Sequence, residues 1–187
     1  MNAGLPRFAG AVLGILLFSG TALAQTLQMN ASWWQQTHDA ERTGFVLGFY
    51  DCPEAPEKIR GATSGDYIEF VDRQVQHETR SNALIPDLLR AAHRGIRARP
   101  ALKGGEVFQE EHGWLDGEWW GDATHGNSTE KIGYVEGYLA CEARPVDMNH
   151  VRQCVDLLNT HFATAGSEHD KIAKVLQIQL DREMSKS

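Results

Sequence analysis

Apolar residues recur three and four positions apart along most of this chain, the spacing that places side chains on one face of an α-helix. No segment alternates apolar and polar residues convincingly, although residues 106–109 could form a short extended piece. The pattern therefore predicts an all-α fold. The segments expected to be helical are 33–52 (with or without a break), 66–75, 85–95, 129–142, 148–162 and 172–180, with a short helix through the tryptophans near residue 120.

One motif occurs twice, from Glu41 to Cys52 and again from Glu130 to Cys141. Acid, base, glycine, aromatic, valine, glycine, aromatic and cysteine hold the same relative positions in both copies, 89 residues apart. The repeat is informative about architecture, because a repeated segment normally marks a repeated structural unit.

Each copy carries two glycines four residues apart, which form a bare stripe along a helix beside the apolar one. Glycine costs about 1 kcal/mol in a helix interior relative to alanine, so two at this spacing indicate that another backbone approaches closely. We expect the two copies to pack against each other along a helix-packing seam made by Gly44, Gly48, Gly133 and Gly137.

The similarity extends beyond the motif, because a Trp-Trp pair precedes each copy and two amphipathic segments follow each one. Two copies are too few for a solenoid. We therefore predict an internally duplicated helical domain of two pseudo-twofold-related units, each of about three helices. The first unit spans residues 25–97, a connecting segment spans 98–113, and the second unit spans 114–187, with both units packed as one domain.

The first 24 residues have the pattern of a secretory signal peptide: Arg7, then an apolar run, then Ala22-Leu23-Ala24 as a cleavage site. This predicts a periplasmic or secreted protein with no integral membrane segment after cleavage. The formal net charge is −7. An acidic chain is poorly suited to nucleic acid or to anionic membranes, which both attract clustered positive charge.

Three cysteines in an exported chain predict one disulfide and one remaining thiol. Cys141 and Cys154 are close in sequence and would face each other across a helical hairpin, so this pair is favoured. The alternative is the motif-equivalent pair, Cys52 with Cys141.

Motifs for catalysis or cofactor binding are not evident. The sequence has no Gly-x-Ser-x-Gly, no His-Glu-x-x-His, no Cys-x-x-Cys and no phosphate-binding glycine loop. We therefore assign no catalytic residue, no metal ligand and no cofactor.

Trp114, Asp116, Glu118, Trp119 and Trp120 form the most unusual local composition and are a tentative ligand or partner surface. Paired carboxylates and aromatic faces are the ingredients of carbohydrate chemistry. The competing interpretation is that these tryptophans fill the core, as matched aromatics in both halves suggest.

Two copies of Gly-[Phe/Tyr]-Val-x-Gly-[Phe/Tyr]-x-x-Cys, each followed by an amphipathic helix and an Ile-x-x-[Leu/Val]-Leu helix, resemble uncharacterised exported bacterial proteins. Each half more distantly resembles the Tai-type immunity proteins of type VI secretion and the acid-stress periplasmic chaperones. The resemblance implies a disulfide-supported helical unit that acts by binding another protein.

These observations favour a non-enzymatic exported protein that binds a protein partner, in an immunity-like or stress-protective role. The alternative is a glycan-binding or carbohydrate-active protein that uses residues 114–120. A monomer and a homodimer are both compatible with the sequence.

Overall fold

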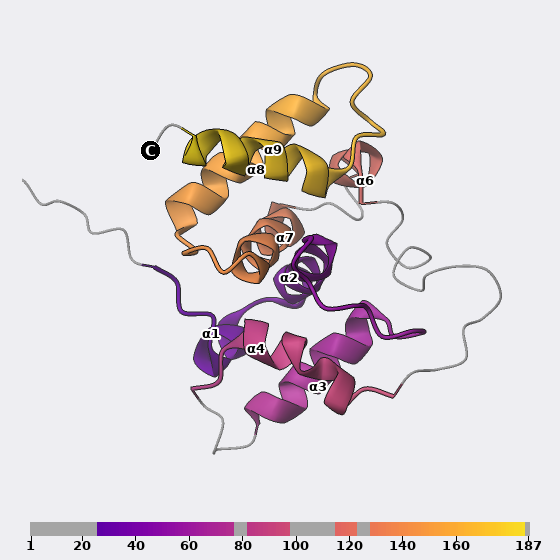
Figure 1. Ribbon diagram of the computed structural model, residues 1–187, viewed down its shortest axis with the longest axis vertical. Helices are drawn as coiled ribbons and strands as arrows, with labels where there is room; N and C mark the ends of the chain where they lie inside the picture. Colours follow the sequence, from indigo (N-terminus) through magenta and orange to yellow (C-terminus); the bar gives the residue numbers. More distant parts are fainter. Residues whose placement is uncertain (1–25, 77–81, 98–114, 123–127, 186–187) are drawn as a thin grey trace, which may run out of the picture.

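The computed structural model describes residues 26–76, 82–97, 115–122 and 128–185 (Figure 1). Within these ranges it contains eight α-helices and no β-strand, so the predicted all-α fold is confirmed. The elements are α1 (Ala31–Gln36), α2 (Asp39–Asp51), α3 (Ser64–Val75), α4 (Ile85–Arg90), the 3₁₀ helix η2 (Ala92–Arg94), α6 (Gly117–Gly121), α7 (Ser128–Cys141), α8 (Met148–Phe162) and α9 (Ile172–Met184).

The predicted signal peptide, 1–24, and the predicted connecting segment, 98–113, lie outside the described residues. In the part of the chain that is described, no helix has the length and apolarity needed to cross a bilayer.

Side-chain caps fix several helix starts. Asn30 accepts the N–H of Trp33 at 3.1 Å at the start of α1. Thr63 and Asp66 form a reciprocal capping box at the start of α3. The segment predicted as one helix over 33–52 is divided at Thr37, whose backbone is extended and whose hydroxyl donates to the carbonyl of Trp33 at 2.7 Å.

α2 and α7 lie side by side at the centre of the molecule and make the most extensive contact between any two described elements (Figure 1). α1, α3 and α4 lie on one side of this pair, and α6, α8 and α9 lie on the other. The largest fully buried side chains of the described residues lie on this pair (Phe45, Phe49, Tyr134 and Tyr138) or on the helices beside it (Trp34, Tyr67 and Trp120).

The glycines of α2 lie directly against the backbone of α7. A Cβ atom at Gly44 would lie 2.0 Å from the carbonyl oxygen of Glu130, and one at Gly48 would lie 1.9 Å from that of Tyr134. Any side chain at either position would overlap the neighbouring helix.

The glycines of α7 make the reciprocal contacts. A Cβ atom at Gly133 would lie 2.1 Å from the carbonyl oxygen of Glu41, and one at Gly137 would lie 2.0 Å from that of Phe45. Residue numbers increase together along both helices, so α2 and α7 run parallel. We call this contact between α2 and α7 the seam.

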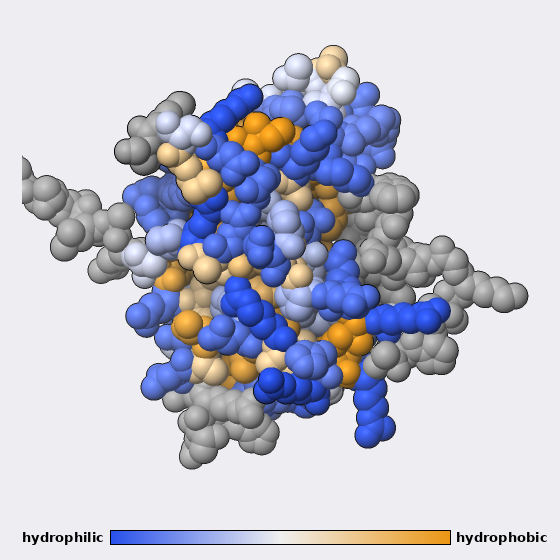
Figure 2. Space-filling model, viewed as in Figure 1, coloured by the Kyte–Doolittle hydropathy of each residue, from blue (hydrophilic) through white to orange (hydrophobic). Residues whose placement is uncertain are grey.

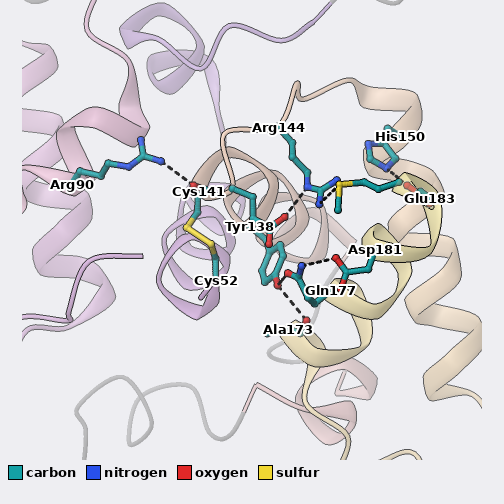
Figure 3. A network of polar contacts seen from close by, with 12 residues as sticks. Cys52, Arg90, Tyr138, Cys141, Arg144, His150, Ala173, Gln177, Asp181 and Glu183 are labelled. Atoms are coloured by element: carbon teal, nitrogen blue, oxygen red, sulfur yellow. Dashed lines mark hydrogen bonds and ion pairs between the residues drawn. A yellow bond between two sulfur atoms is a disulfide. The ribbon is translucent and has the colours of Figure 1, made fainter. Parts of the chain in front are cut away.

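The disulfide closes one end of the seam and joins Cys52 to Cys141, with 6.4 Å between their Cα atoms. The favoured pairing of Cys141 with Cys154 was wrong: Cys154 is a buried free thiol. The reason is the direction of the side chains. Cys141 follows Gly137 by four residues, so it continues the seam face of α7 toward α2, and it does not face α8. Figure 3 shows this end, where the Arg90 guanidinium donates to the Cys141 carbonyl at 2.9 Å.

Candidate functional site

The predicted surface at residues 114–120 lies largely inside the protein, apart from Trp114, which is outside the described residues. Asp116 is 6% exposed, Trp119 5% and Trp120 1%. Neither tryptophan offers an open face on which a sugar could stack. Among the described members of the set, Glu118 alone is exposed, and its carboxylate lies 3.8 Å from His169.

Asp116 and Trp120 have structural partners, whereas the buried indole N–H of Trp119 has none among the described residues. Asp116 caps α6 by accepting the N–H groups of Glu118 at 3.2 Å and Trp119 at 3.4 Å. The Trp120 indole donates to the Asn159 side chain of α8 at 2.9 Å. The expectation of a ligand surface is therefore corrected for Asp116, Trp119 and Trp120, which the fold uses as a helix cap and core.

The same arrangement occurs around the other Trp-Trp pair. The Trp34 indole donates to Asp72 of α3 at 2.7 Å. The Arg42 guanidinium lies 5.4 Å from the centre of the Trp34 ring, as the Lys131 ammonium lies 5.2 Å from that of Trp120. Both pairs thus fix a short helix against the helices that follow it in the chain.

A groove with a volume of about 730 Å³ lies between α8 and α9 on the described surface. α8 and α9 form an antiparallel hairpin whose inner faces supply Val151, Leu158, Leu176 and Leu180 to the core. The groove runs along the opposite side of the hairpin. Its lining residues are Asp156, Leu157, Thr160, His161, Asp170, Lys174, Val175, Ile178, Gln179 and Arg182.

The floor of the groove is apolar and its rim is charged. Leu157, Val175 and Ile178 supply the apolar side chains, and Ile178 is 45% exposed. His161 Nε2 lies 2.8 Å from Asp170 Oδ2 at the end nearest the loop between the helices. Figure 2 shows an apolar patch over α8 and α9 surrounded by hydrophilic residues.

A polar network holds α9 in place from the inner side (Figure 3). The Tyr138 hydroxyl of α7 donates to Gln177 Oε1 at 2.6 Å, and the Gln177 amide donates to Asp181 at 3.0 Å. At the open end of the hairpin, His150 of α8 lies 3.2 Å from the carboxylate of Glu183. One wall of the groove is thereby anchored to the central helix.

A second unusual cluster consists of acids within the seam. Burial raises the pKa of Glu130 to about 7, and burial followed by the influence of Glu41 raises that of Glu136 to about 8. Burial also raises the pKa of Asp51, although the Tyr134 hydroxyl donates to its carboxylate.

The described residues contain no group of three His, Cys, Asp or Glu side chains placed to hold a metal ion. Burial raises the pKa of the Cys154 thiol to about 12, so this free cysteine is a poor nucleophile. What the arrangement offers chemically is an apolar groove with a charged rim and a set of buried acids.

Neither residue set was identified from the sequence as a site. The groove could have been noticed because Leu157 and Ile178 fall outside the inner stripes of their helices. The buried acid could have been noticed because Leu47 occupies the position of Glu136 in the other copy of the motif.

Comparison of the chain with protein-family models, with curated proteins and with solved structures finds no match.

Proposed function

We propose that this chain is a non-enzymatic exported protein that binds another protein through the α8–α9 groove. The observation that carries the proposal is the apolar floor of Leu157, Val175 and Ile178 within a rim of charged and polar side chains. Protein-binding surfaces combine an apolar centre with a polar rim, and a groove between two helices suits an amphipathic helix.

The anchoring of α9 favours binding with little rearrangement. Because Tyr138 and Gln177 fix the inner face of α9, the spacing of the two walls is set before a partner arrives. A preformed groove loses less conformational freedom on binding than a flexible one.

Burial of Trp119 and Trp120 makes the alternative glycan-binding function less favourable, since sugar stacking needs an open aromatic face.

We also infer that the fold is internally duplicated, with a pseudo-twofold axis along the seam. The contacts of Gly44 with Glu130 and of Gly133 with Glu41 exchange when 89 residues are added or subtracted. Outside the seam, the backbone of Ile85 donates to the carbonyl of Met29 at 2.8 Å. The backbone of Ile172 makes the corresponding bond in the second half, to the carbonyl of Leu115 at 3.1 Å.

Export is supported by the Cys52–Cys141 disulfide, because disulfides persist in oxidising compartments. An immunity-like or stress-protective role, implied by the resemblance of each half, belongs to this proposal. The partner would then be a toxin or a client protein of the same compartment.

The test compares two substitutions of equally exposed apolar residues. Ile178→Asp places a charge on the groove floor, and Leu84→Asp places one at the start of α4, in the other half of the molecule; both wild-type residues are 45% exposed. Partners are captured from a periplasmic extract, identified by mass spectrometry and titrated against each purified variant.

We expect Ile178→Asp to weaken partner binding by about 30-fold or more, as for a central interface residue, and Leu84→Asp to leave it unchanged. Equal binding by both variants would refute the groove as the binding site. Turnover of a polysaccharide by the purified protein, with no partner recovered, would refute the protein-binding function itself.

A further inference from the structure

The seam contains a buried carboxylic acid that faces a second carboxylic acid. Glu136 of α7 is 0% exposed. Among the described residues, neither of its carboxyl oxygens makes a hydrogen bond of good geometry, and the side chain that influences it through a hydrogen bond is another acid, Glu41. A buried ionised carboxylate without partners is strongly unfavourable, so such a group normally binds a proton.

A second acid faces it across the seam. Glu41, in the first turn of α2, is close enough to interact with Glu136, and both groups bind protons more tightly than usual. Burial is the largest cause of the raised pKa of each, and for Glu136 the charge of Glu41 is the next. A hydrogen bond with Glu136, and after it the charge of His38 just before α2, act in the opposite direction on the pKa of Glu41.

Three ionisable side chains on α4 and α8, which pack against α7, are engaged elsewhere. Arg90 of α4 binds the Cys141 carbonyl at the opposite end of the seam. On α8, His150 pairs with Glu183, and His161 pairs with Asp170. The neighbouring charge that raises the pKa of Glu136 is that of Glu41.

The geometry of the seam gives the acids little room to relax. The helices touch at backbone distance on both sides of Glu136, where Gly133 meets the Glu41 carbonyl and Gly137 meets the Phe45 carbonyl. Helices this close leave little space for water to solvate a charge between them. An ionised pair would be relieved only by separation of the helices.

We propose that the seam is a proton-dependent contact. One proton held between Glu41 and Glu136 allows α2 and α7 to pack at backbone distance, and loss of that proton loosens the contact. Separation begins at the end that carries Glu41, because the Cys52–Cys141 disulfide fixes the other end.

The direction in which stability changes with pH follows from the difference between the Glu136 pKa in the unfolded chain and in the fold. In the unfolded chain the Glu136 carboxyl has its ordinary pKa of 4.5, whereas burial raises its pKa to about 8 in the fold. The stabilisation is therefore complete below pH 4.5 and is lost as the pH rises toward 8. Most carboxylates make the fold more stable as the pH rises, because folding lowers their pKa values.

The experiment is denaturant unfolding of the disulfide-intact protein between pH 5 and pH 9, together with ¹³C NMR titration of the Glu136 carboxyl. For the wild-type protein we expect the folding equilibrium constant to fall on the order of a thousandfold over this range, since each unit of pKa difference corresponds to a factor of ten. We expect Glu136→Gln to remove most of this fall.

Glu130→Gln is the matched control, because Glu130 is a second acid in α7 whose pKa burial raises to about 7. This variant should retain the part of the pH dependence that Glu136 causes. If the glutamine at 136 prevents folding, Glu136→Leu replaces it, since Leu47 stands at that position in the other copy of the motif. A Glu136 carboxyl that titrates below pH 5, or an unchanged pH profile in the variant at 136, would overturn the proposal.

Discussion

Gly137→Ala should destabilise the protein although alanine is the better helix former. The added methyl carbon would lie 2.0 Å from the Phe45 carbonyl oxygen and 2.9 Å from the Phe49 nitrogen. Real Cβ atoms essentially never approach a heavy atom within 3.0 Å, so the helices must separate by about 1 Å at this point. The obstacle is backbone, which cannot rotate away as a side chain can.

Two opposing terms set the magnitude. Alanine improves helix propensity by about 1 kcal/mol. Overpacking costs ~1–3 kcal/mol when side chains can adjust, and more is expected here because the disulfide and the reciprocal glycine contacts resist separation. We expect a net loss of about 2 kcal/mol or more, which lowers the melting temperature of a domain this size by about 4–8 °C.

Gly65→Ala is the control for this prediction. Gly65 is exposed in the first turn of α3, and a Cβ atom there would have its nearest neighbour, Thr63 Oγ1, at an ordinary 3.5 Å. This variant should gain ~0.4–1 kcal/mol from reduced chain entropy. The assay is urea and thermal unfolding followed by circular dichroism at one pH. A Gly137→Ala protein as stable as Gly65→Ala would refute close backbone packing at the seam.

Two further predictions concern the cysteines. Cys52→Ser should cost ~4–5 kcal/mol, because the chain-entropy relation gives this value for a link between residues 89 apart; an unchanged denaturation midpoint would contradict it. In the unreduced wild-type protein, maleimide should label one thiol, and only after denaturation, with peptide mapping placing the label at Cys154. A label on Cys52 would show that the pairing is different.

The sequence was sufficient to predict the helices and the position of the seam glycines because both depend on local spacing. A glycine at every fourth position has few purposes in a helix interior other than close approach. The same reasoning contained the correct disulfide: Gly44, Gly48 and Cys52 fall on one face at four-residue intervals, as do Gly133, Gly137 and Cys141. Proximity in sequence was the wrong criterion, because a side chain's direction on its helix decides what it can reach.

The candidate site was less accessible from the sequence because it depends on packing between helices. Whether Ile178 is core or surface is decided by which face of α9 meets α7, and the Tyr138–Gln177 bond that fixes this face joins residues 39 apart. The tryptophans illustrate the reverse case. An acidic, aromatic composition has the ingredients of a binding surface, but the Trp120 ring is buried and its indole donates to Asn159 of α8.

The two copies of the motif share their backbone contacts and differ in their polar chemistry. Glycines and cysteines occupy corresponding positions in both, so the seam's geometry is specified twice. Where the first copy has Leu47 and Phe49, the second has Glu136 and Tyr138, and these bring a buried acid to the seam and a hydrogen bond to α9. The glycines set how closely α2 and α7 approach, and that closeness is what makes a single acid at position 136 consequential. If the two helices packed less closely, water would reach a carboxyl at this position, and the carboxyl would titrate as an ordinary surface acid.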